Sequence, residues 1–582
     1  MTPALPFSPI ALTPCPKGYT KDLDKVVSPE ETLRHVRSRL QALDLDILKE
    51  TRRVDVGRLG IPVYMSLCGA DAVKLLPTRK QMGKGSSPAQ AEASAIMELV
   101  ERFSFFSFFA RCDGLDRETW QEAQAHYGED LLPVSEILRS VQESMDGKDA
   151  LAILNLLPWT FYPALDLQRE KQVWLPLDWF RLLNEFNGSS AGNSDVESLL
   201  QGLCEVVERH VCWQIEREQL ICPTIDQSSC TDPTLCELLA AFARENIHLV
   251  LKDFSHAFPL PTIAAVAWDE RTFPASSEIV FTAGTASSPA KAAIRTVTEI
   301  AQLGGDFCTK SCYEASGLNK YHSLEDIAWL LQGQMIRMDE MASCEASDIL
   351  DELRKAVAGL APLRTYALSL RHPGLDLPAH YTIVPGLDFR ERDRNQSLGL
   401  FVGRRLVEEA EPELALAGLA RLGQIYGEKT HFLPFFRGLL ALREGELAQA
   451  EQAFASAIDL QPDPTSQALV YFYYGYVLTR QEAWQKAQKP LKEASVLAPE
   501  VRDYVSLLGV ARFKTAAYAE AEADFQRALA IDKGSAWDLA NLGLCQKIQG
   551  KTAEARKHLR LALSLDSSID FARKALAELE AL

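Results

Sequence analysis

Carboxylates and an arginine recur at helical spacing in a glycine-rich stretch of the sequence, residues 83–102. Glu98, Glu101 and Arg102 follow Ser87, a serine placed to cap a helix. Residues three and four positions apart share one face of a helix, so these charged groups should project together. The proline after the serine and Gln90 at the third helical position complete a predicted capping box, which indicates where the helix begins.

The same pattern returns twice further along the chain. Counted from Ser194, which also begins a predicted capping box, Glu205, Glu208 and Arg209 stand at the offsets of the first copy. The third copy begins at residues 287–290, nearly repeats residues 86–89, and places Arg295 and Glu299 on the corresponding face. A single acidic helix face is usually solvated surface. Three matched faces, each behind a glycine-bearing loop, predict one shared site.

The chemistry that such a site suits is narrow. Four converging carboxylates would resist ionising together unless cations lay between them. Mg²⁺ prefers oxygen ligands and commonly shares them with phosphates, and arginine, lysine and helix N-termini bind phosphate. The acids are Glu98, Glu205, Glu208 and Glu299, and the cationic groups are Lys84, Arg102, Arg209 and Arg295. Because the loop lacks the upstream glycine of a Walker motif, the residues predict a magnesium nucleoside triphosphate bound by a different device.

These motifs together resemble the YcaO family. The resemblance covers residues 15–400 and rests on four segments: residues 83–87 with 98–102, Gly192–Asn193 with 205–209, residues 295–299, and residues 384–387. It implies ATP and Mg²⁺ as cofactors.

The family pattern also assigns roles to single residues. It places Lys21, Ser28, Ser94, Asn193, Glu197, Gln201 and Arg295 near the nucleotide, and their positive charge adds Lys84 and Arg102 to the expected nucleotide contacts. The expected metal ligands are Glu98, Glu101, Glu205, Glu208 and Glu299, and the expected catalytic residues are Glu101, Glu208, Arg209 and Arg295. The assignments of Lys21 and Ser28 rest on spacing alone.

YcaO proteins activate a peptide backbone amide by phosphorylating its oxygen after a nucleophile has added to the carbon. A neighbouring Cys, Ser or Thr side chain gives an azoline, and external sulfide gives a thioamide. Azoline-forming members typically end in a proline-rich tail, whereas residues 577–582 read Ala-Glu-Leu-Glu-Ala-Leu. We therefore expect a peptide or protein substrate and thioamide formation, or a sulfur-linked modification such as support of ribosomal protein β-methylthiolation. An azoline-forming cyclodehydratase and a non-catalytic, nucleotide-gated protein that recruits a methylthiotransferase are the alternatives.

Strands and helices must position these residues. Alternating apolar residues predict strands at 61–67, 173–179, 248–252, 262–268, 279–282 and 381–387, and a helix is predicted at 29–45, with Ser28 as its cap. A polar helical insertion is expected at 113–150. Strands alternating with helices predict an α/β (α+β) domain of three repeated strand–loop–helix units over residues 1–407.

From residue 408 onward the sequence becomes alanine-rich and periodic. Gly438, Gly475, Gly509 and Gly543 recur at intervals close to 34, and apolar residues follow at fixed offsets. This resembles the tetratricopeptide repeat, with residues 569–582 as a terminal capping helix. We expect residues 408–582 to bind a partner, such as a sulfur-delivery protein or methylthiotransferase, or to form a homodimer.

Composition excludes several classes of protein. The net charge of −18 argues against a nucleic-acid surface. The first residues do not read as a signal peptide, and no apolar run is long enough to cross a membrane, so a cytoplasmic protein is expected. The twelve cysteines form no Cys-x-x-Cys pair and are expected to be reduced and mostly buried.

Overall fold

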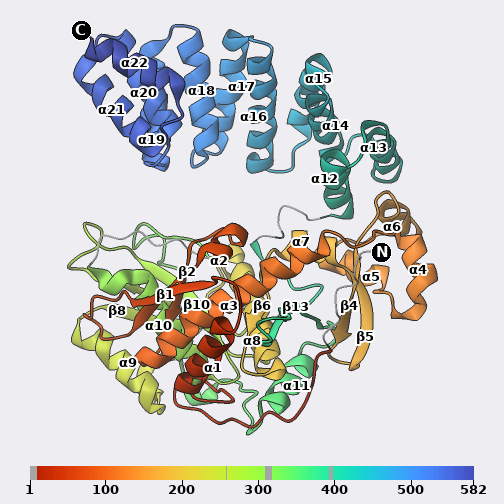
Figure 1. Cartoon of the computed structure of the whole chain (residues 1–582), viewed down its shortest axis with the longest axis vertical. Helices are drawn as coiled ribbons and strands as arrows, with labels where there is room; N and C mark the ends of the chain where they lie inside the picture. Colours follow the sequence, from red (N-terminus) through yellow and green to blue (C-terminus); the bar gives the residue numbers. More distant parts are fainter. Residues whose placement is uncertain (1–8, 257, 309–317, 391, 393–396, 582) are drawn as a thin grey trace. The chain divides into compact units, whose positions relative to one another are not determined.

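The computed structural model describes residues 9–256, 258–308, 318–390, 392 and 397–581. The chain forms two compact units, one of residues 1–151 with 158–397 and one of residues 152–157 with 398–582. The first unit contains all the strands of the described residues, and the second is helical (Figure 1). The boundary predicted between residues 407 and 408 falls within helix α12 (Leu398–Glu409), which belongs to the second unit. Cys312 and Leu582 lie outside the described residues.

Three separate sheets build the first unit. The first is β1 (Leu48–Arg53), β2 (Val63–Cys68) and β3 (Lys80–Lys84), in that order. The second has the order β10 (Val280–Thr285), β9 (Thr262–Trp268), β8 (His248–Asp253), β7 (Thr224–Asp226) and β11 (Met335–Arg337). The third has the order β5 (Lys171–Pro176), β4 (Phe161–Asp166), β12 (Tyr366–Ser369), β13 (Ala379–Ile383) and β6 (Ser189–Ala191). Pairing between these strands is antiparallel except for β7 with β11.

Each repeated helix follows the edge strand of one sheet. Helix α3 (Pro88–Cys112) follows β3, α8 (Asp195–Glu218) follows β6, and α10 (Pro289–Gly304) follows β10 (Figure 1). Every one of these helices also contacts the edge strand of another unit: α3 contacts β6, α8 contacts β10, and α10 contacts β3. This cyclic contact brings the three helices together and confirms the three predicted strand–loop–helix units.

The apolar flank predicted for the first helix is buried. Ile96, Leu99, Val100 and Phe103 are at most 4% exposed. Burying side chains of this size stabilises a fold by roughly 1.5–3 kcal/mol each, which is enough to fix the opposite, polar face toward a cavity.

Helices α3 and α8 begin where the sequence predicted, but each forms only the serine half of the predicted capping box. The Ser87 and Ser194 hydroxyls accept from the backbone N–H groups of Gln90 and Glu197. The Glu197 carboxylate does not return to the backbone of Ser194. It accepts instead from the backbone N–H and side-chain amide of Asn193. The Glu197 carboxylate therefore binds the residue before the N-cap instead of the N-cap itself.

Two predicted strands end earlier than the sequence suggested. Residues 177–179 begin helix α7 (Leu177–Asn184) instead of extending β5. The last strand, β13, ends at Ile383 rather than at residue 387, because Pro385 has no N–H to continue a ladder. The remaining helices of this unit are α1 (Pro29–Gln41), α2 (Ala70–Leu75), α4 (Trp120–Tyr127), α5 (Val134–Ser140), α9 (Pro233–Arg244) and α11 (Ile349–Gly359). Helix α6 (Gly147–Leu154) begins in this unit and ends in the second, because residues 152–157 belong to the latter. None of the helices in the described part of the chain could span a membrane.

The second unit is an array of antiparallel helix pairs. It begins with α12 and α13 (Pro412–Tyr426), and four pairs follow, then a final helix that packs on α20 and α21. These helices are α14 (Phe432–Arg443), α15 (Leu447–Ala457), α16 (Pro464–Arg480), α17 (Trp484–Leu497), α18 (Arg502–Lys514), α19 (Tyr518–Ile531), α20 (Ala536–Ile548), α21 (Thr552–Leu565) and α22 (Asp570–Glu580). The repeat glycines lie where the two helices of a pair meet, because a side chain there would collide with Phe454, Leu491, Phe525 or Leu559. The tetratricopeptide repeats are thereby confirmed.

Candidate functional site

A cavity of about 470 Å³ lies between the three repeated helices. Its lining includes most of the residues that the sequence assigned to a site, and they come from all three strand–loop–helix units. These residues are Lys84, Ser94, Glu98, Glu101, Arg102, Asn193, Glu197, Gln201, Glu205, Glu208, Arg209, Arg295 and Glu299.

Most carboxylates in the cavity are held by a donor from another part of the chain. Glu101 accepts a hydrogen bond of 2.7 Å from the Ser189 hydroxyl, and Glu205 accepts from the backbone N–H of Gly188. Glu299 pairs with the Lys84 ammonium at 2.6 Å. The Oε2 atom of Glu208 differs, because it is buried and has no hydrogen-bond partner among the described residues. A buried acceptor left in this state fits a cation or a proton that the protein itself does not supply.

Burial sets the electrostatics of the acids. Loss of solvation raises the pKa of Glu98, raises that of Glu101 to about 8 and raises that of Glu208 to about 7. The arginine beside each glutamate offsets only part of this effect. At Glu299 burial acts in the same direction, but the charge and hydrogen bond of Lys84 outweigh it and lower the pKa. The site therefore holds carboxyls with different proton affinities at neutral pH.

One wall of the cavity carries two of the residues expected to contact the nucleotide, Asn193 and Glu197. Glu197 accepts from Asn193, lies 3.3 Å from the Lys25 ammonium and accepts from the backbone N–H of Val26. The Asn193 side-chain oxygen in turn accepts from the Thr32 hydroxyl. This wall thus joins the start of α8 to the N-terminal segment.

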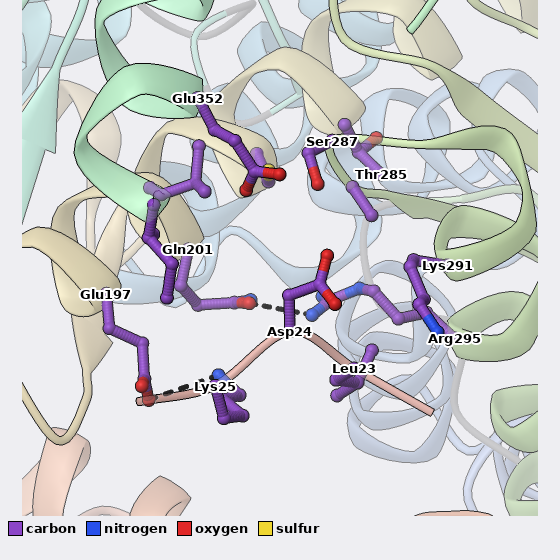
Figure 2. Close-up of a pocket in the computed structure, with 14 residues that line it drawn as sticks. Leu23, Asp24, Lys25, Glu197, Gln201, Thr285, Ser287, Lys291, Arg295 and Glu352 are labelled. Carbon is purple, nitrogen blue, oxygen red and sulfur yellow. Dashed lines mark hydrogen bonds and ion pairs between the residues drawn. The ribbon is translucent and has the colours of Figure 1, made fainter. Parts of the chain in front are cut away.

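A smaller pocket of about 50 Å³ adjoins this wall, and Figure 2 shows its lining. Lys25, Glu197, Gln201 and Arg295 line both cavities. One guanidinium nitrogen of Arg295 donates to the Gln201 side-chain oxygen at 2.7 Å, while its Nε is buried with no hydrogen-bond partner among the described residues. A guanidinium N–H that is buried and has no partner in the protein suits an anion.

Two predicted nucleotide residues do not line either cavity. Ser28 is the N-cap of α1, where it forms a complete capping box with Glu31. Lys21 is exposed, and its backbone carbonyl accepts from the Thr234 hydroxyl. Lys25, which lies four residues after Lys21 and which the sequence analysis did not select, lines the cavity instead. Both lysines lie in a segment without regular structure, so helical or strand periodicity gave no means to choose between them.

Glycines allow the helices to approach the strands before them. A Cβ atom at Gly83 would collide with the backbone of Ala91 and Ala95, and one at Gly284 would collide with that of Ala292 and Thr296. These partners lie at the same offsets, eight and twelve residues after each glycine.

Magnesium is usually held by one or two carboxylates together with phosphates and water. In the part of the chain that the structure describes, no three or more His, Cys, Asp or Glu side chains lie together as a group that could hold a metal ion, so the five glutamates predicted as ligands do not form such a group by themselves.

Residues 82–388 match the family described as YcaO cyclodehydratase, ATP- and Mg²⁺-binding. The chain is 27% identical over 414 residues to an uncharacterized protein of Methanothermobacter thermautotrophicus, which covers 66% of this chain and 98% of that protein. It is also 27% identical over 291 residues to the ribosomal protein S12 methylthiotransferase accessory factor YcaO of Escherichia coli, covering 44% of this chain and 48% of that protein. The chain thus spans about half the length of this second relative.

A solved structure of a heterocyclase in complex with substrate and cofactor has a similar fold. The TM-score is 0.51 at 20% identity, and the match covers 66% of this chain and 55% of the heterocyclase. The family match includes all three repeated helices and extends from β3 to Asp388. This chain is a member of the YcaO family of ATP- and Mg²⁺-binding proteins, with tetratricopeptide repeats in its second unit.

Proposed function

We propose that this protein activates a backbone amide of a peptide or protein substrate, most simply for thioamide formation or another sulfur-linked modification. The observation that carries the proposal is the cavity in which acids of α3, α8 and α10 face cationic side chains. An amide is a poor electrophile, and its oxygen is a poor leaving group. ATP with Mg²⁺, when bound, would supply the phosphoryl group that makes this oxygen a good leaving group.

The residues on each wall would divide this work. Arg295, Lys84 and Arg209 would neutralise phosphate charge, since guanidinium and ammonium groups form charge-assisted hydrogen bonds with phosphate oxygens. Glu98, Glu205 and Glu299 would provide oxygen ligands to magnesium, and Asn193 with Glu197 would orient the nucleotide. Lys25 joins this group through its contact with Glu197.

Glu101 and Glu208 would handle protons. A nucleophile that adds to the amide carbon must lose a proton, and a carboxyl with a pKa near neutrality can accept it and later release it. Burial raises the pKa of Glu208 to about 7 and that of Glu101 to about 8. The free Oε2 atom of Glu208 is the acceptor without a competing partner.

The metal role of Glu205 can be tested by Glu205→Gln, which removes the charge and keeps the shape. We expect a loss of about 1.4 kcal/mol or more in the Mg²⁺-dependent binding of ATP, a factor of ten, measured by titration calorimetry. Glu218→Gln, in the exposed last turn of the same helix, is the matched control and should bind like the unaltered protein. Equal affinity for Glu205→Gln and the control would remove Glu205 from the metal site.

The reaction class is decided by the mass of the product. Ribosomal and other abundant proteins from cells with and without this chain can be compared by mass spectrometry. Replacement of one oxygen by one sulfur supports thioamide formation, whereas loss of one water identifies an azoline.

The similarity to the Escherichia coli accessory factor favours a second candidate, an auxiliary role in methylthiolation of a ribosomal protein. A methylthio group that depends on this chain, without any change at a backbone amide, would identify that role.

A further inference from the structure

Two cysteines outside the cavity lie close enough to react with each other. Cys236 is in the first turns of α9, and its Sγ atom lies 3.6 Å from the Sγ of Cys230, just before the helix. Cys236 is exposed and Cys230 is partly exposed. Apart from Cys308, which is also exposed, the other cysteines of the described residues are buried. Cys230 and Cys236 are therefore, among the described residues, two neighbouring thiols that solvent can reach.

The residues between the two cysteines hold a distant segment of the chain. Asp232 is the N-cap of α9, and its carboxylate also pairs with the Lys291 ammonium at 3.4 Å. Lys291 donates to the backbone carbonyls of Thr20 and Lys21, at 2.8 and 3.2 Å. Thr234, in the first turn of α9, donates to the same carbonyl of Lys21 at 3.1 Å.

We call residues 17–27 the N-terminal strap, because this irregular segment runs from these contacts to the cavity. Leu23 and Lys25 of the strap line the cavity, and Lys25 contacts Glu197. Figure 2 shows Leu23, Asp24 and Lys25 as a continuous segment, with Lys291 and Glu197 among the side chains around it. The start of α9 thus anchors the strap at Thr20 and Lys21, a few residues before the strap enters the site.

We propose that Cys230 and Cys236 are a redox-modification site whose disulfide fixes the anchor of the N-terminal strap and thereby tightens nucleotide binding. To form the disulfide, the distance between the two Sγ atoms must shorten from 3.6 Å to about 2.05 Å, which requires the two side chains to move toward each other. Nucleotide binding needs the strap in place to present Lys25 and Glu197 together. An anchor that is already fixed lowers the entropy lost on binding. The coupling to nucleotide rests on the function proposed above, whereas the disulfide itself does not.

The oxidation balances with hydrogen peroxide as the oxidant. Cys236 is the more exposed of the two thiols, so peroxide reaches it first, whereas burial and the contact with Cys236 raise the pKa of Cys230 to about 12. Peroxide converts the Cys236 thiol to a sulfenic acid and releases one water. The Cys230 sulfur then attacks the Cys236 sulfur, and the hydroxyl leaves with the Cys230 proton as a second water. Two thiols lose two electrons, one peroxide is reduced to two waters, and a dithiol reductant reverses the reaction.

The test uses the full chain in reduced and peroxide-treated forms. Non-reducing peptide mass mapping should show a cross-link between Cys230 and Cys236. The oxidised protein should then bind an ATP analogue, methylene-bridged between its last two phosphates, with Mg²⁺ about three-fold to ten-fold more tightly, the effect of ordering one or two side chains in advance. Hydrogen exchange of residues 18–26 should slow at the same time. Cys230→Ser and Cys236→Ser should form no cross-link and show no gain in nucleotide affinity after peroxide treatment, while Cys308→Ser, which removes an exposed thiol elsewhere, should respond like the unaltered chain.

Two results would overturn the proposal. The first is over-oxidation of Cys236 without a cross-link, which would show that Cys230 does not resolve it. The second is a complete cross-link with unchanged or weaker nucleotide affinity. If the reduced protein itself fails to bind the analogue, the proposed function fails, and the cross-link together with slowed exchange of the strap still decides whether the thiols control the anchor.

Discussion

Glu208 and Glu299 carry the same functional group in the same cavity, yet their surroundings shift their pKa values in opposite directions. Burial acts on both carboxyls, but Lys84 pairs directly with Glu299. One oxygen of Glu208 has no partner among the described residues, and its pKa rises to about 7. This one difference in contact is our reason for proposing a proton-handling role for Glu208 and a charged, metal-binding role for Glu299.

The raised pKa values predict how stability depends on pH. Between the ordinary glutamate pKa of 4.5 and the raised values of about 7 and 8, Glu208 and Glu101 bind more protons in the folded state than in the unfolded state. The nucleotide-free protein should therefore lose stability as pH rises through this window. Glu208→Gln cannot ionise and should raise the free energy of unfolding at pH 8 by about 1–3 kcal/mol.

Denaturant unfolding at pH 5, 6.5 and 8 measures this effect. Glu218→Gln, on the same helix but exposed, is the control and should keep the slope of the unaltered protein. A Glu208→Gln variant with that same slope would show that Glu208 ionises normally.

At the scale of elements, close contact between each helix and the strand before it sets the direction of the acidic face. Gly83 and Gly284 occupy equivalent positions in the first and third units and lie against the backbone of their helices. At Gly83 the three nearest partners are all backbone atoms, so no change of side-chain rotamer can make room for a methyl group there. The glycines that precede the repeated helices thus allow close packing of strand against helix, in addition to leaving the helix N-termini accessible.

Gly83→Ala should separate β3 from α3 and displace Glu98 and Glu101. We expect a loss of stability of about 1–3 kcal/mol, the usual effect of overpacking, together with weaker ATP binding. Thermal unfolding and calorimetric titration measure the two effects. Gly147→Ala, where a Cβ atom meets nothing within 4 Å, is the matched control. An unchanged ATP affinity would mean that the helix position does not depend on this contact.

The helical repeats depend on a similar contact between side chains. A Cβ atom at Gly509 would lie 2.9 Å from the ring of Phe525, which is fully buried in α19. Gly509→Leu should overpack this helix pair and destabilise the second unit by about 1–3 kcal/mol in denaturant unfolding. Gly534→Leu, in an exposed turn of the same array, should have little effect. Equal stability of both variants would contradict the assigned contact between the helices.

At the scale of the whole molecule, the two units divide the chain's chemistry. The cavity residues all belong to the first unit, and the array of repeats contributes none of them. Tetratricopeptide arrays stack each unit on its neighbours and leave an extended surface for other proteins. We therefore assign partner recognition or self-association to the second unit as a proposal.

A chain that ends at Ser397, before α12, tests this division. If its circular dichroism shows a folded protein, it should keep the ATP affinity of the full chain, because the lining of the cavity is intact. It should also lose a partner, a substrate or its oligomeric state, which light scattering and binding assays measure. Loss of ATP binding from this folded chain would contradict the division.

The sequence by itself determined the fold class, the repeats and most of the charged residues that line the cavity. Three serines start helices on which acids recur at the same offsets, so helical periodicity alone predicted their shared faces. The 34-residue spacing of glycines predicted the helix pairs, because each repeat contacts only its neighbours in sequence. These features depend on local spacing, which a sequence records directly.

Only the tertiary structure decided which irregular segments reach the cavity. It selected Lys25 rather than Lys21, and it placed Cys230 beside Cys236 at the anchor of the strap. It also gave Glu208 an unpartnered oxygen and Glu299 a lysine. The position of an irregular segment is set by contacts with residues distant in sequence, and a pKa is set by burial and neighbouring charges. Neither leaves a periodic pattern in the chain, so both had to be read from the folded structure.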